Sequence, residues 1–391
     1  MISVSEALNH LFALAAPLPA ESVPLAQANG RVLAAPVRAA RDQPPFASSA
    51  MDGYAIVADG AAPGARYTVI GEAAAGHAFD GSVGPGQAVR IFTGAPVPAG
   101  ANRVIIQEDV IRDGDTITLS DKLDQGFHIR PLGGDFLSGQ KVTAPRTLRP
   151  ADIALLAAMN IATVPVTRKP RIAILSTGDE LVMPGENPGP DQIIASNSFG
   201  LQAMLRDHGA DMRMLPIARD NRAALEMAFS LVDDADLLLT IGGASVGDHD
   251  LVGEVAAGLG MQRSFYKIAI RPGKPLMAGR LANGAMMIGL PGNPVSAMVC
   301  GHVFVLPVLR AMLGLGAALA PELRAPLAAP VGPNGPRQHY MRARLDNGTL
   351  TVFDNQDSSL LSVLARANAL AIRPPNDPAQ PAGSELAYLP I

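Results

Sequence analysis

The chain has 391 residues, 48% of them apolar, and a formal net charge of −4 with a pI near 6.0. This length exceeds one ordinary hydrophobic core and predicts roughly two to four domains, while the absence of a basic excess argues against nucleic acid as the main partner. The single cysteine, Cys300, excludes a disulfide framework and a thiolate metal cluster. Its apolar neighbours predict a small core residue, and one cysteine fits a reducing compartment.

The first residues are predicted to form an amphipathic helix rather than a signal peptide. Ser3 can act as the N-cap, and Glu6 can complete a capping box. Apolar residues then follow at helical spacing, namely Ala7, Leu8, Leu11 and Leu14. The segment contains acid and histidine but lacks a basic start. The longest apolar stretch, 284–309, is interrupted by LPGNP. We therefore expect no membrane span and a cytoplasmic protein.

Two segments with helical patterning flank a β-rich one. Residues 1–45 and 141–168 are rich in alanine and leucine at helical spacing. Residues 46–140 hold short runs rich in valine, isoleucine and threonine, separated by glycine or proline. This order predicts an antiparallel β domain inserted into a helical domain that is built from both flanks.

The rest of the chain is predicted to form an α/β domain and then a small β domain. Residues 169–315 alternate between strand-like and helical runs, which predicts a central parallel sheet in an α/β/α arrangement. One helix is expected to begin after Asp220, which can cap it. Residues 316–391 predict a sandwich or β-barrel with Asn347-Gly348 in a hairpin turn. Such a parallel sheet binds ligands beyond the carboxyl ends of its strands.

Two loops at these strand ends combine glycine with carboxylates. STGDEL, 176–181, places Glu180 where either a metal site or a capped turn would explain it. TIGGASVGDHD, 240–250, begins with small residues whose backbone N–H groups can cradle a phosphate. The carboxylates of Asp248 and Asp250 would repel that phosphate unless Mg²⁺ lay between them. An ordinary turn remains the alternative for this loop. Its small residues are Gly242, Gly243, Ala244, Ser245 and Gly247.

Positive charge gathers in the next segment, because residues 255–321 contain no Asp or Glu. In YKIAIR a strand would place Lys267 and Arg271 on one face, about 13 Å apart. That spacing could serve two anions or one long polyanion, or it could be a solvated face. LPGNPVSA adds a tight turn in which Pro291 precedes the turn and Pro294 begins a helix. The basic residues of the segment are Arg263, Lys267, Arg271, Lys274, Arg280 and Arg310.

Further short stretches could be turns or parts of a site. SSAMDGYAI and RIFTGAPVPAGA place Asp52 and Thr93 beside glycine and proline. HIRPLGGDF places Asp135 in a glycine-rich loop. His249 is a candidate acid or base, although a single histidine in a loop is more often exposed to solvent. Together with the phosphate cradle and the basic segment, these residues predict a site for a phosphorylated ligand.

Taken in order, SAMDGYA, FTGAPVP, STGDEL, GGASVGDHD, RPGKP and LPGNPVS resemble the MoeA family of molybdopterin molybdenumtransferases, which is similar to the E domain of gephyrin. The resemblance spans nearly the whole chain. It implies an elongated homodimer of four-domain subunits, in which residues 1–45 plus 141–168 form the dimerisation domain. It also implies a molybdopterin-binding domain and an active site in a cleft between subunits.

The resemblance further implies a reaction. The family takes adenylylated molybdopterin and molybdate, inserts molybdenum at the dithiolene and releases AMP, with Mg²⁺ assisting. Transient contact with an adenylyltransferase and with proteins of molybdoenzyme maturation would follow. The family's functional acids correspond to Asp52, Asp135, Glu180, Asp220 and Asp250. Its polar and basic partners correspond to Thr93, Lys267, Arg271, Arg342 and Ser358.

These positions imply a division of labour. Glu180 and Asp250, with Asp220 as a further candidate, would hold Mg²⁺ on the pyrophosphate. Lys267 and Arg271 would hold molybdate and a ligand phosphate. The positions expected to bind the pterin ligand are Gly242, Gly243, Ser245, Gly247, Lys274, Pro291, Pro294, Arg342 and Ser358.

Three positions depart from the family pattern. Ala195 stands where aspartate is often found before Ser-Asn, and Asp357 stands where glycine is common before the serine. Arg271 replaces a frequent lysine, which keeps the charge but changes the donor geometry. Two other functions are therefore kept in view: a molybdopterin adenylyltransferase on the same fold, and a binding or scaffold paralogue without turnover. The β segments outside the α/β domain disfavour the first, and the intact acids disfavour the second.

Overall fold

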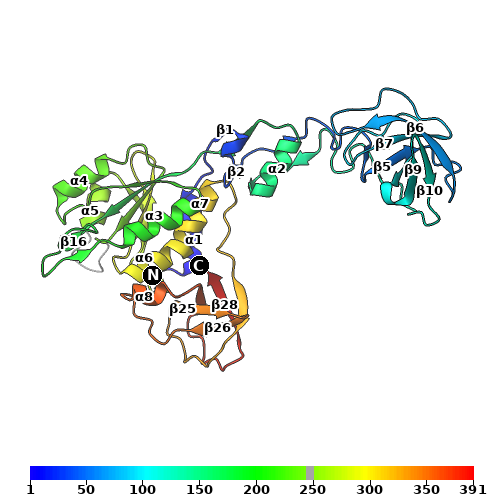
Figure 1. The fold of residues 1–391 in the computed structure, drawn as a ribbon. Coiled ribbons are helices and arrows are strands. Elements are labelled where there is room, and N and C mark those ends of the chain that lie inside the picture. The colour runs from blue at the N-terminus through cyan, green and yellow to red at the C-terminus, as the bar shows by residue number, and fades with distance from the viewer. Residues whose placement is uncertain (244–250) are drawn as a thin grey trace.

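The computed structural model describes residues 1–243 and 251–391. The molecule is elongated, with an α/β domain and a small β-barrel at one end and a separate β domain at the other (Figure 1). A narrow segment of short strands and helix α2 (Pro150–Ala158) joins the two ends, and the chain passes through it twice. The β domain at the far end, residues 46–140, is called the distal β domain below.

The N-terminal helix α1 (Val4–Leu14) begins with the predicted capping box, in which the Glu6 amide donates to the Ser3 hydroxyl and the Ser3 amide donates to the Glu6 carboxylate. Its Leu8 and Leu11 are buried in the core of the α/β domain. The rest of the first 45 residues contains no α-helix, contrary to the prediction, because prolines interrupt it. It contains β1 (Ala20–Pro24), the short 3₁₀ helix η1 (Leu25–Gln27), β2 (Val32–Leu33) and β3 (Val37–Arg38).

Strands from both flanks of the distal β domain pair in the narrow segment. A sheet with the order β1-β14-β2-β13 contains β13 (Arg146–Thr147) and β14 (Thr163–Thr167), and β3 pairs with β12 (Lys141–Val142). Within 141–168, all of which the structure describes, α2 is the only helix, so the helical prediction was too broad. These pairings tie the two chain passes together, as expected for an inserted domain.

Six strands form the sheet of the distal β domain, in the order β8-β5-β7-β6-β10-β9. Neighbours are antiparallel, as predicted, except β6 and β7, which run parallel. A two-stranded ribbon pairs β4 (Ser48–Ser49) with β11 (Ile129–Arg130). The sheet strands and the intervening 3₁₀ helix are β5 (Gly53–Ile56), β6 (Arg66–Ala73), β7 (Gln87–Ile91), β8 (Arg103–Ile106), η2 (Gln107–Asp109), β9 (Val110–Asp113) and β10 (Thr116–Leu119).

The α/β domain has a six-stranded sheet in the order β18-β15-β19-β23-β22-β20. The prediction of a parallel sheet is right for β18, β15, β19 and β23, whereas β22 and β20 are antiparallel additions at one edge. The strand β22 was not predicted. The bounds are β15 (Arg171–Ser176), β18 (Asp211–Met214), β19 (Leu237–Ile241), β20 (Gln262–Tyr266), β22 (Met277–Arg280) and β23 (Met286–Leu290), with a small pair β16 (Leu181–Val182) and β17 (Ile193–Ile194) beside the sheet.

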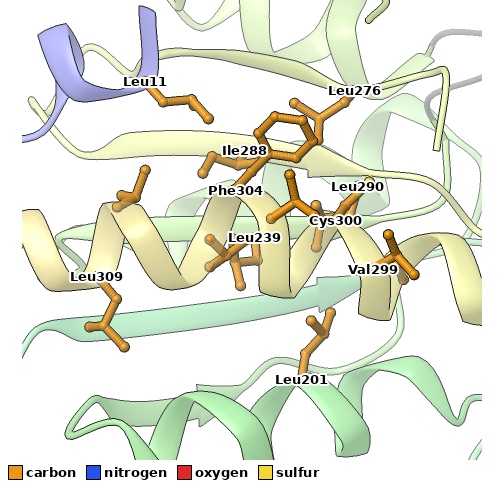
Figure 2. Packing of buried hydrophobic residues seen from close by; sticks show 14 of the residues in the cluster. Leu11, Leu201, Leu239, Leu276, Ile288, Leu290, Val299, Cys300, Phe304 and Leu309 are labelled. Atoms are coloured by element: carbon orange, nitrogen blue, oxygen red, sulfur yellow. The ribbon is translucent and has the colours of Figure 1, made fainter. Parts of the chain in front are cut away.

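Helices cover both faces of this sheet. Figure 2 shows Leu11 of α1, Leu201 of α3 and Phe304 packed with sheet residues around Leu239. The opposite face packs against α4 and α5. Cys300 is fully buried in the first cluster, which confirms a core residue. The helices are α3 (Asn197–Asp207), α4 (Arg222–Ser230), α5 (Leu251–Gly258), α6 (Pro294–Cys300), a π-helical turn η3 (Gly301–Val305) and α7 (Leu306–Met312).

The continuous helix from Pro294 to Met312 is apolar and long enough to cross a membrane, but 78% of its most apolar stretch is buried inside the protein. Its apolar residues belong to the core cluster in Figure 2, so packing inside the protein explains their apolar character.

The predicted cap of helix α4 was wrong. Asn221, not Asp220, caps this helix, because its side chain accepts a hydrogen bond from the Ala224 amide.

The predicted strand through YKIAIR is broken. β20 ends at Tyr266, and Lys267 has a left-handed φ of 74°, which a regular strand excludes. The next strand, β21 (Ile270–Arg271), leaves this sheet and pairs in parallel with β25 of the C-terminal barrel. Lys267 and Arg271 therefore do not share one strand face, and the prediction of a single strand through both residues was wrong.

The C-terminal domain is the predicted small barrel. Its strand order is β21-β25-β27-β28-β24, with β26 also on β25, and a hydrogen bond from the Ala328 amide to the Leu350 carbonyl, 3.0 Å long, closes the sheet. Asn347 and Gly348 both have positive φ, as the predicted hairpin turn requires. The elements are β24 (Leu323–Pro326), β25 (Gln338–Asp346), β26 (Thr349–Val352), α8 (Leu361–Leu364), β27 (Ala369–Arg373) and β28 (Glu385–Pro390).

Candidate active site

A cleft of about 910 Å³ lies between the α/β domain and the barrel. Its α/β wall is formed where β15, β19 and β23 end, which is the sheet edge that the sequence predicts. The residues that follow these strands are Thr177, Gly242 and Pro291 respectively. The barrel contributes Arg337 and the stretch 356–359. The cleft is therefore built by two domains of the same chain.

The floor of the cleft depends on glycine. Gly242 has a φ of 91°, and a side-chain Cβ there would lie 2.6 Å from the Thr177 carbonyl oxygen. At Gly243 a Cβ would lie 2.2 Å from Val252 Cγ2. Glycine is therefore required at both positions for close packing against Thr177 and Val252, and Gly242 lines the cleft at the end of β19. The predicted positions Ser245, Gly247, His249 and Asp250 lie outside the described residues.

The basic residues of the cleft come from two segments. Arg271 is the last residue of β21 and Lys274 lies in the loop that follows, whereas Arg337 precedes β25 and donates through Nη1 to the Ile270 carbonyl oxygen at 3.3 Å. The predicted Lys267 does not line this cleft, and its ammonium lies 5.1 Å from the centre of the Tyr266 ring. Three cations that line one cleft suit a ligand with several negative charges.

The proline turn connects the two walls. Pro291 and Pro294 both line the cleft, as predicted. Between them, Asn293 donates through Nδ2 to the Ser358 hydroxyl at 3.1 Å, and the Val295 amide donates to the Ser358 carbonyl at 3.1 Å. Ser358 of the barrel is thereby fixed against the start of α6.

Carboxylates gather at one edge of the cleft. Glu180 lines it, whereas Asp220 lies behind it, in a loop where the Asp220 amide donates to the Asp179 carboxylate at 3.3 Å. Burial raises the pKa of Asp220, and the nearby charges of Asp179 and Glu180 raise it further. Among the described residues no three acidic, histidine or cysteine side chains converge as a metal site. The third expected metal-binding residue, Asp250, lies outside those residues.

Arg342 supports the barrel wall from behind. Its side chain is buried, and it donates to the carbonyl oxygens of Asp357 and Asn355 and to the Gln356 side chain. Burial lowers the pKa of Arg342, while the Asp357 carboxylate partly opposes this change. Arg342 therefore holds the loop that carries Ser358, and it does not itself line the cleft.

Asp52 and Thr93 meet in the distal β domain. Thr93 donates to Asp52 Oδ1 from its backbone amide and from its hydroxyl, each at 2.7 Å. These two hydrogen bonds lower the pKa of Asp52, the bond from the Thr93 backbone having the larger effect, and the charge of Arg90 lowers the pKa further. Asp135 is exposed in the same domain. The strands β5 and β7 beside Asp52 and Thr93 lie at the opposite end of the molecule from the α/β domain and the barrel (Figure 1), and none of the three residues lines the cleft of its own chain.

Comparison with known proteins accounts for each of these domains. Residues 2–160 match the MoeA N-terminal region (domain I and II), 173–311 match a probable molybdopterin binding domain, and 324–391 match the MoeA C-terminal region (domain IV). A Nostoc protein named molybdopterin molybdenumtransferase is 33% identical over 398 residues, covering 96% of this chain and 90% of the relative. The chain belongs to the MoeA family.

Other MoeA relatives agree. The molybdopterin molybdenumtransferase 2 of Mycobacterium tuberculosis is 37% identical over 380 residues, covering 93% of each protein. The crystal structure of a MoeA protein from Pyrococcus horikoshii superposes with a TM-score of 0.85 at 28% identity, covering 100% of this chain and 99% of that one. The elongated multidomain architecture is therefore the MoeA fold.

The MoeA motifs did not reveal every residue of the cleft. Arg337, Ser296 and Asn197 line it, and Asn197 donates through Nδ2 to the Gly292 carbonyl oxygen at 2.7 Å. Ser296 belongs to LPGNPVSA, so its place one turn into the helix was a usable signal. No local motif predicts the place of Arg337, because the pairing of β21 with β25, two segments far apart in sequence, brings it to the cleft.

Proposed function

We propose that this protein inserts molybdenum from molybdate into adenylylated molybdopterin and releases AMP, as a step of molybdenum cofactor biosynthesis. The curated relatives that cover nearly the whole chain are named molybdopterin molybdenumtransferase. The observation that carries the proposal is the cleft itself, which is lined by Arg271, Lys274 and Arg337 together with Gly242 and Glu180. This combination suits a ligand that carries phosphate groups together with a small oxyanion.

Different residues of the cleft bind different parts of the ligands. The guanidinium groups of Arg271 and Arg337 and the ammonium of Lys274 bind the negative charges of the phosphates and of molybdate. Gly242 lets the ligand approach the strand end, and Ser358 offers a hydroxyl from the barrel side. No protein nucleophile is needed. Water attacks phosphorus, the pyrophosphate P–O bond breaks and AMP leaves, while the two dithiolene sulfurs replace one oxygen of molybdate, which departs as water with the two thiol protons.

Mg²⁺ fits the carboxylate edge. Burial raises the pKa of Asp220, and the nearby Asp179 and Glu180 raise it further by like-charge repulsion, which a divalent cation with its preference for oxygen would relieve. Glu180 and Asp220 are the described residues that would hold it, together with the expected Asp250. When bound, the ion would neutralise charge on the phosphate oxygens as the P–O bond breaks.

We further propose that the active unit is a homodimer. Asp52 and Thr93 adjoin strands at the end of the molecule away from the α/β domain and the barrel (Figure 1), and Asp135 does not line the cleft of its own chain. A two-fold partner whose distal β domain reached this cleft would bring the two sets together, because a symmetric dimer forms both such contacts at once. A cytoplasmic location and transient contacts with an adenylyltransferase and with maturation proteins complete this proposal.

A turnover assay tests the reaction. The protein is mixed with adenylylated molybdopterin, Mg²⁺ and molybdate, and AMP is measured with and without molybdate. Molybdate-dependent AMP release is the expected result, and Glu180→Ala should abolish it while leaving the thermal unfolding temperature unchanged. Pyrophosphate release from ATP would instead indicate an adenylyltransferase. Tight ligand binding without any product would indicate a binding protein.

A further inference from the structure

We propose that Arg90 is a positioning residue that holds the Asp52–Thr93 pair in its active geometry. This inference rests on the proposed function, in which that pair is part of the active site. Nothing in the motifs singles out Arg90. Its role follows from four contacts: three end on residues within two positions of Asp52 or Thr93, and the fourth ends on a residue whose backbone binds that of Asp52.

The pair sits at the end of two paired strands. Asp52 immediately precedes β5, and Thr93 lies two residues after the end of β7. These strands are antiparallel, with Gly53 opposite Ile91 and Tyr54 opposite Arg90. The strand ladder therefore stops just before the pair, and its geometry depends on side chains as well as on the sheet.

The guanidinium of Arg90 supplies those side-chain contacts. It lies 5.0 Å from the centre of the Tyr54 ring and 4.8 Å from that of Phe92, where cation–π attraction operates. Its Nη1 donates to the Gly53 carbonyl at 3.2 Å, and its Nη2 donates to Gln107 Oε1 at 2.7 Å. Tyr54 and Gly53 follow Asp52 in the chain, and Phe92 precedes Thr93.

A third strand end is tied into the same cluster. The Gln107 amide donates to the Asp52 carbonyl oxygen at 3.0 Å, so the residue that accepts from Arg90 also fixes the backbone of Asp52. Gly53 cannot accept a side chain, because a Cβ would lie 1.9 Å from the Ile105 carbonyl oxygen. The backbone on the C-terminal side of Asp52 is thus clamped between β8 and Arg90.

Lysine could not replace these contacts. A guanidinium is planar and presents donors in two directions while its faces stack on rings, whereas an ammonium is a single point charge. Arg90→Lys keeps the charge near Asp52 but loses the simultaneous bonds to Gly53 and Gln107. It therefore separates positioning from simple charge neutralisation.

The experiment compares Arg90→Met, Arg90→Lys and Gln107→Leu with the control Arg112→Met, which removes an exposed arginine bonded to Gly114 in the same sheet. Hydrogen exchange at the Thr93 amide reports the bond to Asp52 independently of activity. In Arg90→Met we expect faster Thr93 exchange and a kcat for AMP release reduced by about 10- to 100-fold, with KM unchanged. Arg90→Lys should lie between Arg90→Met and the wild type, and the control should match the wild type.

The outcomes are distinct. Unchanged Thr93 exchange in both Arg90→Met and Gln107→Leu would overturn the inference, and Gln107→Leu serves this purpose if Arg90→Met does not fold. Faster exchange with wild-type turnover would overturn the link between this pair and the reaction. A wild-type protein that releases no AMP would overturn the proposed function, while the exchange rates would still decide whether Arg90 holds the pair.

Discussion

At the scale of single residues, the cleft combines strong positive charge with one opposing group from the barrel. Among the described residues that the barrel contributes to the cleft, Asp357 is the one acid. Its Oδ1 accepts from the Ser359 amide at 2.8 Å and from the Ser359 hydroxyl at 2.7 Å, and these bonds lower the pKa of Asp357. The carboxylate is therefore ionised at neutral pH and faces any anion in the cleft.

Replacing this charge should strengthen anion binding. Asp357→Asn keeps an oxygen for Ser359 but removes the repulsion, so we expect molybdate to bind roughly three- to tenfold more tightly at low salt, with less gain at high salt. Isothermal titration measures this, and Asp354→Asn, outside the cleft, is the control. Equal molybdate affinity in Asp357→Asn and the wild type would exclude an electrostatic role.

A second residue, Gly178, sets the position of the Glu180 carboxylate. A Cβ at Gly178 would lie 2.3 Å from Glu180 Oε2, and its φ of 148° is one that side chains rarely adopt. Gly178→Ala should therefore displace the carboxylate and reduce AMP release by at least about tenfold. Gly189→Ala is a matched control in a less crowded loop position, where a Cβ makes ordinary contact. Wild-type turnover in Gly178→Ala would show that this orientation of Glu180 is not needed.

At the scale of elements, helix α2 is held in the narrow segment by one buried carboxylate. Asp152 accepts from the Arg149 amide at 2.9 Å and pairs with the Arg146 guanidinium, so it links the helix to β13. Burial alone would raise the pKa of Asp152, but these two partners outweigh it and lower the pKa below its usual 3.8. The charged form is the one that the folded segment favours.

Asp152→Asn should thus lower the free energy of unfolding of this segment by about 1–3 kcal/mol at pH 7. Because the folded pKa is depressed, this stabilisation is present above the ordinary pKa of aspartate and is lost as the pH falls through the folded value. Hydrogen exchange in α2 as a function of pH measures it, with exposed Asp113→Asn as the control. A difference between Asp152→Asn and the wild type that persisted unchanged in strong acid would contradict the assignment.

A second element-scale feature is the short strand β21. It leaves the α/β domain after the turn around Lys267 and pairs with β25, so its own Arg271 and the following loop with Lys274 are held beside the barrel. This crossing brings Arg337 to the cleft. The position of the basic wall therefore depends on a pairing between domains and not on one continuous strand.

At the scale of the whole molecule, the distance between the cleft and the distal β domain allows a decisive test of the dimer. Asp52→Asn and Glu180→Gln homodimers should each be inactive. If the sites lie between subunits, a 1:1 mixture that exchanges subunits should regain about a quarter of wild-type AMP release, because each mixed dimer contains one intact site. Mixtures that stay inactive after verified subunit exchange would place the complete site within one chain.

Features set by neighbouring residues were predicted correctly more often than features set by contacts between distant segments. Local patterns were reliable: the capping box at Ser3, the Asn347-Gly348 turn and the buried Cys300 depend on residues near one another in the chain. The predicted directions of strands were less reliable. The parallel pair β6–β7 and the antiparallel strand β22 depend on which strand, distant in sequence, lies alongside.

The sequence by itself determined the MoeA family, the order of α and β segments, the glycine floor and the expected set of acids and bases. These features depend on short motifs of residues that are close together in the sequence. Only the tertiary structure decided that Arg337 joins Arg271 in the cleft and that Lys267 does not line it. It also decided that the strands beside Asp52 and Thr93 lie at the end of the molecule away from the α/β domain and the barrel. The physical reason is that these relations depend on pairing and packing between segments far apart in sequence, which local periodicity does not encode.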